Sequence, residues 1–201
     1  MKNKIIIALT IAAISTSSLA RNISGVEVLE TIQAKNFSLN LNGAGVRSKV
    51  FMDLYVGSLF TEQPTQSSQL LINGDYPSAI RLNITSGMIT ASKLTEALNE
   101  GFQLATNGNT AMIDESINDF IEATFREEVK KGDQFTFVSA PNDGLYSYKN
   151  EILLDYRNDD AFRKALLSVW LGDKPTDKKL KKTDAWGLSI IAYTLTTWSC
   201  R

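Results

Sequence analysis

The chain has 201 residues, with 21 lysines and arginines against 22 aspartates and glutamates, and a formal net charge of −1. Without a surplus of basic residues, binding to nucleic acid is not indicated. The chain has no histidine and a single cysteine, Cys200, which excludes a Ser-His-Asp triad, histidine metal ligands, cysteine-rich zinc sites and an internal disulfide, so we expect no metal and no cofactor.

The first twenty residues have the pattern of a secretory signal. Lys2 and Lys4 precede an apolar run from Ile5 to Ile14, and small residues stand three and one positions before a cut after Ala20. The apolar run is shorter than the roughly 20 residues that span a bilayer. We therefore expect residues 1–20 to be removed, which would leave a periplasmic or secreted protein without a membrane span. An uncleaved N-terminal anchor is the alternative.

Two neighbouring strands are predicted on either side of the segment from Gly43 to Lys49. Polar and apolar residues alternate from Phe37 to Asn42, which indicates a strand with one buried face. The run from Val50 to Val56 is almost wholly apolar, as in a strand covered on both faces. Arg47 lies between these runs, where its charge is costly to bury without a partner. A ligand, solvent or a carboxylate such as Asp53 could be that partner.

Further strands and helices follow in order. Alternation from Ile80 to Ile84 predicts a third strand, and three short runs between Asp133 and Leu154, joined by tight turns, predict an antiparallel meander. Capping residues and helical spacing of apolar residues predict helices from a Thr90 cap to Asn107 and Gly108, from an Asn109 or Thr110 cap to Phe125, and from Asn158 or Asp159 to Gly172. This order predicts an α+β fold, in which one antiparallel sheet carries a layer of helices on one face.

One domain is predicted between two flanking segments. Residues 21–183 hold the predicted elements, and we interpret their first part, 21–35, as a lead-in strand or a loose arm. Residues 184–201 form an apolar C-terminal tail with hardly a charge, to which the pattern assigns no role. Its β-branched residues are typical of a strand, and an extension that binds a partner is the alternative.

Three stretches of this sequence resemble chalcone isomerase-like proteins. The run NGAGVRSKVFMDLYVGSLF at 42–60 resembles their first strands, and GAGVR at 43–47 is its most specific part. The resemblance continues through TASKLTEA at 90–97 and ALLSVWLGD at 165–173, so it covers most of 37–182 in the right order. The chain is similar to a bacterial secreted branch of that family. This implies an open-faced β-sandwich with a ligand pocket between the sheet and the helices.

The resemblance also implies a set of ligand-binding residues. It matches the family's arginine to Arg47, whose planar fork of donors suits a carboxylate or an enolate. It matches the family's helix lysine to Lys93, close to a helix start where the dipole favours an anion. Thr90 stands in place of a tyrosine and completes the implied site. From the pattern alone, Lys93 is an ordinary surface lysine and Thr90 a helix cap.

Other positions depart from the catalytic pattern of the family. Ala97 stands for an asparagine, Leu54 for a threonine and Val169 for a polar residue on the last helix. Since a single hydrogen-bond donor is commonly worth roughly 10²- to 10³-fold in rate, such a site has lost most of its stabilisation of a transition state.

The resemblance and these departures together imply a noncatalytic protein that binds a small amphipathic anion. The ligand class is that of a fatty acid, as for some relatives. An intramolecular lyase of the chalcone isomerase type, with Arg47 and Lys93 as catalytic residues, is the first alternative. A structural or interaction protein is the second.

Cleavage of the signal gives a direct test of the export hypothesis. The mature protein should begin at or next to Arg21, because the small residues before Ala20 fit a signal peptidase site. N-terminal sequencing of protein from the soluble or periplasmic fraction measures this. Intact Met1 in that fraction would contradict export by cleavage.

Overall fold

The computed structural model describes residues 20–49 and 52–175. The predicted tail at 184–201 and all of the predicted signal except Ala20 lie outside the described residues. Strands are β1 (Ala20–Ile23), β2 (Val26–Leu29), β3 (Thr31–Ala34), β4 (Phe37–Lys49), β5 (Met52–Thr61), β6 (Ser78–Ile84), β7 (Gln134–Ala140), β8 (Gly144–Lys149) and β9 (Ile152–Arg157). Helices are α1 (Ser68–Asn73), α2 (Ala91–Ala105), α3 (Asp114–Phe125) and α4 (Asp160–Leu171).

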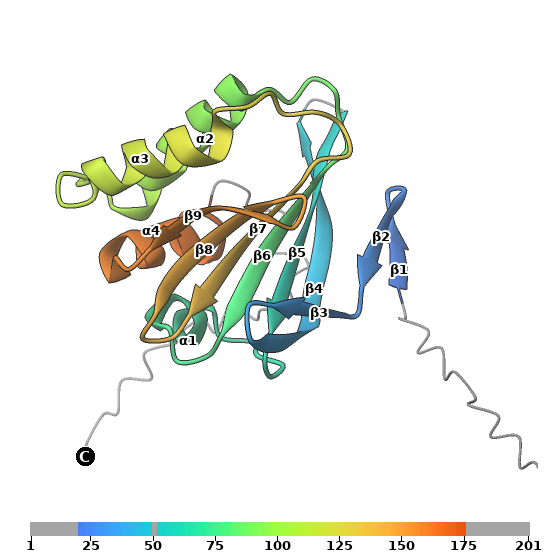
Figure 1. Cartoon of the computed structure of the whole chain (residues 1–201), viewed down its shortest axis with the longest axis horizontal. Coiled ribbons are helices and arrows are strands. Elements are labelled where there is room, and N and C mark those ends of the chain that lie inside the picture. Colours follow the sequence, from blue (N-terminus) through green and yellow to red (C-terminus); the bar gives the residue numbers. More distant parts are fainter. Residues whose placement is uncertain (1–19, 50–51, 176–201) are drawn as a thin grey trace, which may run out of the picture.

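A curled antiparallel sheet forms the centre of the molecule (Figure 1). Its seven strands run in the order β3-β4-β5-β6-β7-β8-β9, so each strand pairs with its neighbours in the sequence. The four helices accompany this sheet, while β1 and β2 form a separate hairpin beside β3 and β4 (Figure 1). The predicted α+β fold, with its antiparallel meander, is confirmed.

Alternation of side chains along the strands gives the sheet two buried faces. One face packs against the helices; among its residues are Tyr55, Leu59, Ile80, Leu82, Phe135 and Phe137, in contact with Leu94, Leu98, Phe102, Phe120, Phe162 and Trp170. The opposite face forms a second cluster, with Val56, Phe60, Ala79 and Val138 beneath Val28 of β2 and Ile32 of β3. The segment at 21–35 is therefore a lead-in of three short strands that covers the second face.

Capping residues position two of the helices as predicted. The Thr90 side chain accepts a hydrogen bond from the backbone N–H of Lys93, and the Asp159 side chain accepts one from that of Phe162. The predicted start of α3 at Asn109 or Thr110 is wrong. The Thr110 carbonyl accepts the Ile113 N–H in a turn (2.8 Å), and the helix begins only at Asp114.

Two distant turns hold the curl of the sheet together. Lys35, between β3 and β4, forms an ion pair with Asp143, between β7 and β8, and donates to the hydroxyl of Tyr146 at 2.6 Å. The Tyr146 hydroxyl lies 3.0 Å from Asp143 Oδ1. These contacts connect one end of the strand order to β8. Within the described part of the chain, no helix is both long and apolar enough to cross a membrane.

Gly144 offers a test of this turn. Its φ of 133° is unfavourable for residues with a side chain, and an added Cβ would overlap the backbone carbonyl oxygen of Arg157. Gly144→Ala should therefore lower the free energy of unfolding by at least about 2 kcal/mol, measured by denaturant titration. Gly87→Ala is the matched control, because an added Cβ there meets nothing within 4 Å. Equal stability of the two variants would contradict the strain at this turn.

Candidate functional site

A small cavity of about 40 Å³ lies between the sheet and the helices. The sheet contributes Arg47, Tyr55, Leu82 and Phe137, and the helices contribute Leu94, Ala97, Leu98, Phe125, Val169 and Trp170. Among the described residues that line it, Arg47 is the only charged one, and most of the others are aliphatic or aromatic. The arrangement matches the predicted location of a pocket between the sheet and the helical layer.

Strand pairing brings Arg47 into this cavity. Arg47 of β4 lies directly opposite Tyr55 of β5, so both side chains project toward the helices. The register of this pair shifts between Arg47 and Ser48, which indicates a bulge at the point where the arginine is presented. Arg47 is half-buried, whereas Tyr55 is 6% exposed. The guanidinium therefore approaches an apolar space from the end of a strand.

Aromatic side chains fill most of the space beside Arg47. The indole N–H of Trp170 donates to the hydroxyl of Tyr55 at 3.2 Å, and the indole stacks on Phe137 with ring centroids 5.7 Å apart. The remaining volume suits a few water molecules, whereas pockets for small organic ligands commonly measure about 300–1,000 Å³. An acyl chain can enter only if some of these side chains move.

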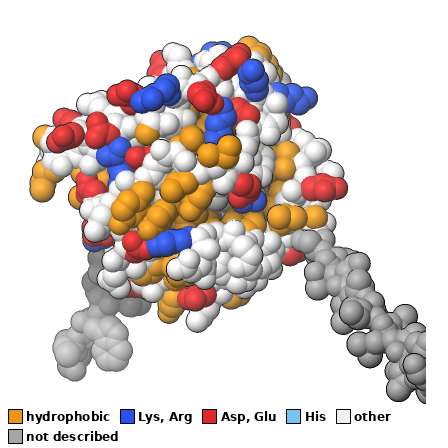
Figure 2. Space-filling view, viewed as in Figure 1, with side chains coloured by type: hydrophobic (Ala, Val, Ile, Leu, Met, Phe, Trp, Pro, Cys, Tyr) orange, Lys and Arg blue, Asp and Glu red, His pale blue; other side chains and the backbone are white. Residues whose placement is uncertain are grey.

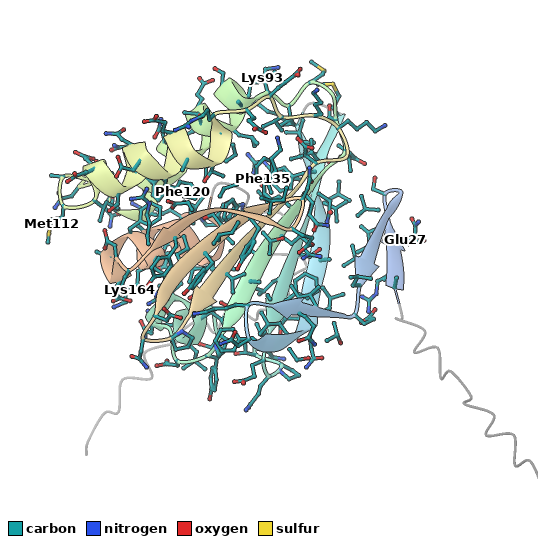
Figure 3. All side chains as sticks on the ribbon, viewed as in Figure 1. Glu27, Lys93, Met112, Phe120, Phe135 and Lys164 are labelled. Atoms are coloured by element: carbon teal, nitrogen blue, oxygen red, sulfur yellow. The ribbon has the colours of Figure 1, made fainter. Side chains whose placement is uncertain are left out.

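Lys93 and Thr90 lie outside this lining. Lys93 is exposed on α2, where its ammonium donates to the backbone carbonyl of Met88 at 2.9 Å. Figure 3 shows Lys93 near the outer end of α2, whereas Phe135 lies between the sheet and the helices. Thr90 is exposed and caps the helix. The structure thus brings neither residue to the cavity beside Arg47, and their role in ligand binding stays a prediction.

The family positions that lost polar groups do reach the cavity. Ala97 and Val169 both contribute to its lining. On β5 the lining residue is Tyr55; Leu54 does not line the cavity, although it packs against the same helix-side cluster. Sequence reasoning missed Tyr55 and Trp170 as site residues. Trp170 could have been found, because it shares the apolar helix face of Leu166.

Asp53, the carboxylate that the sequence offered as a partner for Arg47, lies on β5 two residues before Tyr55. Asp53 accepts hydrogen bonds from the hydroxyls of Ser24 (2.6 Å) and Ser48 (2.8 Å). These bonds stabilise the charged form and lower the pKa of Asp53, the bond from Ser24 having the larger effect. Both carboxylate oxygens therefore have hydroxyl donors, and the alternative of an ion pair between Arg47 and Asp53 stays a prediction.

Charged side chains elsewhere on the described surface are the remaining groups to consider. In residues 20–49 and 52–175, no three Cys, Asp or Glu side chains gather in a way that could hold a metal ion. Figure 2 shows acidic and basic side chains intermingled on the face in view, with apolar side chains between them. This face therefore shows no continuous basic patch of the kind that nucleic-acid binding requires.

Comparisons with known proteins agree with this architecture. A family model described as chalcone isomerase-like matches residues 20–183. The crystal structure of a fatty-acid binding protein from Arabidopsis thaliana is similar, with a TM-score of 0.64 and 14% sequence identity. The match covers 82% of this chain and 94% of that chain, and at this identity it shows a shared fold. No curated protein sequence matches the chain.

Removal of the Tyr55 hydroxyl tests the packing beside Arg47. Tyr55→Phe should lower the free energy of unfolding by about 1–3 kcal/mol, because the indole N–H of Trp170, a residue only 6% exposed, would lose its acceptor. Thermal and denaturant unfolding measure the loss. Tyr156→Phe is the control, since that hydroxyl donates to Asp143 O at the surface and water can replace it. Equal losses in the two variants would contradict a structural role for the buried bond.

Proposed function

The chain belongs to the chalcone isomerase-like family, and from this premise we propose that it is a noncatalytic binding protein for a small amphipathic anion such as a fatty acid. The anionic head would lie at Arg47 and the apolar part among the aromatic and aliphatic side chains beside it. The main support is the composition of the helix-side cavity, in which one guanidinium borders an otherwise largely apolar lining. A planar guanidinium suits a carboxylate because it can donate two parallel hydrogen bonds.

The lining also supports binding without catalysis. Ring closure of a chalcone needs hydrogen-bond donors placed where negative charge develops. Ala97 and Val169 supply none, although both line the cavity. The fold shared with a plant fatty-acid binding protein is consistent with a binding role.

Ligand entry requires the helix-side cavity to open. A fatty acid needs more than the present 40 Å³, so the indole of Trp170 or the ring of Phe137 must move away. Opening costs free energy, and the apparent affinity falls by the fraction of molecules that are open. Short acyl chains displace fewer side chains, so we expect them to bind with the smaller opening cost.

We further propose that the protein is exported, as in a bacterial secreted branch of the family. The charged start, the short apolar run and the small residues before Ala20 support this.

Substitution of Arg47 tests the binding proposal. Arg47→Leu should weaken binding of decanoate about tenfold to a hundredfold, because a charge-assisted hydrogen bond to the carboxylate is lost. Lys93→Ala should weaken it less, since that exposed ammonium already donates to Met88 O and acts only as a nearby charge. Isothermal titration calorimetry measures both affinities.

Arg126→Leu is the matched control for this experiment. Arg126 pairs with Glu122 on the exposed side of α3 and lies outside the cavity lining, so its loss should leave decanoate affinity unchanged. Unchanged affinity in Arg47→Leu would remove the site from this cavity. Turnover of a chalcone by the parent protein at an ordinary enzyme rate, on the order of 10 per second, would overturn the noncatalytic proposal.

A further inference from the structure

A second and larger cavity, of about 170 Å³, lies on the opposite face of the sheet beneath β2. Its lining consists of Glu27, Val28, Leu29, Ser58, Phe60, Arg81, Asn83 and Gln134. Arg81 alternates with Leu82, which lines the helix-side cavity, so the two cavities lie on opposite faces of the same strands. The paired strands therefore separate this second cavity from Arg47.

Arg81 places a buried positive charge in this cavity. It is 6% exposed, and its Nε and Nη2 donate to Thr136 Oγ1 and Glu151 Oε1, each at 3.0 Å. A guanidinium has five N–H groups, so the described residues account for two of them. The Glu151 side chain is 66% exposed, and an ion pair with a solvated partner compensates a buried charge only in part. Burial lowers the pKa of Arg81, and the charge of Glu151 opposes that effect.

Ser58 supplies a second, independent observation. The residue is fully buried, and its hydroxyl has no hydrogen-bond partner among the described residues. A buried polar group without a partner is costly and is uncommon in native proteins. Ser58 shares this face of β5 with Phe60 and is part of the cavity wall, in which its hydroxyl is covered. Nearby, Asn83 Oδ1 accepts from the amide of Gln134 at 2.9 Å, which leaves the Asn83 amide N–H groups as further donors.

The shape and charge of the cavity limit what it can hold. Its volume is many times the roughly 10–15 Å³ that one water molecule needs. The ring of Phe60 lies 5.8 Å from the Arg81 guanidinium carbon, and with Val28 it forms an apolar wall. Glu27 is exposed and alternates with the buried Val28, and Figure 3 shows it on the outer side of the hairpin.

We propose that this cavity is a binding site for a small carboxylate, whose oxygens accept hydrogen bonds from Arg81 and Ser58 and whose short apolar part packs on Phe60 and Val28. The ligand adds a second negative charge and further acceptors to those that Glu151 and Thr136 supply to Arg81. A carboxylate of a few carbon atoms fits the volume, whereas a long acyl chain does not. This site is separate from the proposed fatty-acid site at Arg47.

Butyrate is a suitable probe, because it combines one carboxylate with a three-carbon apolar part. In an amide NMR titration of the full chain, butyrate should shift the signals of Ser58, Arg81 and Asn83 with a single saturable affinity. Arg81→Met should weaken that affinity at least about tenfold, since a hydrogen bond to a charged group is lost. Arg126→Leu, which removes a surface arginine, should leave it unchanged.

Ser58→Ala separates binding from folding. Because the hydroxyl has no partner in the described structure, its removal should leave the melting temperature unchanged or raise it, yet weaken butyrate binding severalfold. If Arg81→Met does not fold, the butyrate affinity of Ser58→Ala still tests the site. The site is overturned if butyrate gives no saturable shifts, if its shifts are confined to Tyr55 and Ala97 of the Arg47 cavity, where short acyl chains are also expected to bind, or if both variants bind butyrate as the parent does. The first outcome would mean that the cavity holds only water.

Discussion

Burial of the central strands on both faces is the constraint on which this structure depends. Helices cover one face of β5 and β6, and the short strands β2 and β3 cover the other. Every polar side chain on these strands must therefore find a partner inside the protein or pay for lost hydration. Arg47 and Arg81 occupy opposite faces under this constraint, and each borders a cavity. Both candidate sites thus arise because an arginine lies on a strand face that other elements cover.

Local patterns predicted much of the fold because they act over a few residues. Alternation from Ile80 to Ile84 gave β6, and the capping residues Thr90 and Asp159 gave the starts of two helices. The start of α3 was wrong because cap preference is weak compared with the geometry of a turn. The Thr110 carbonyl accepts from the Ile113 N–H in a separate turn, and the helix begins only after Ile113.

The sites were less predictable because they depend on contacts between distant segments. Apolar residues at Leu94 and Leu98 define the buried face of α2 and put Lys93 beside that face, as the sequence spacing alone could have indicated. Arg81 is a harder case. Its alternation with Ile80 and Leu82 indicates the sheet face away from the helices, and this is the face that the structure gives it. From the sequence alone, a polar residue on that face is expected to be exposed. Only the cover by β2, some fifty residues earlier, buries it.

The two cavities also differ in how they can change size. Strands β5 and β6 form backbone hydrogen bonds with neighbouring strands on both sides. The sheet lies between the two cavities, and its strands therefore resist being pulled apart. Helix α2 packs on this sheet through side chains such as Leu98 and Phe102, and side-chain contacts can rearrange without loss of backbone hydrogen bonds. Enlargement of the helix-side cavity must therefore come from α2 and from side chains such as the indole of Trp170 or the ring of Phe137. The cavity beneath β2 already has room for a small ligand and needs no such opening.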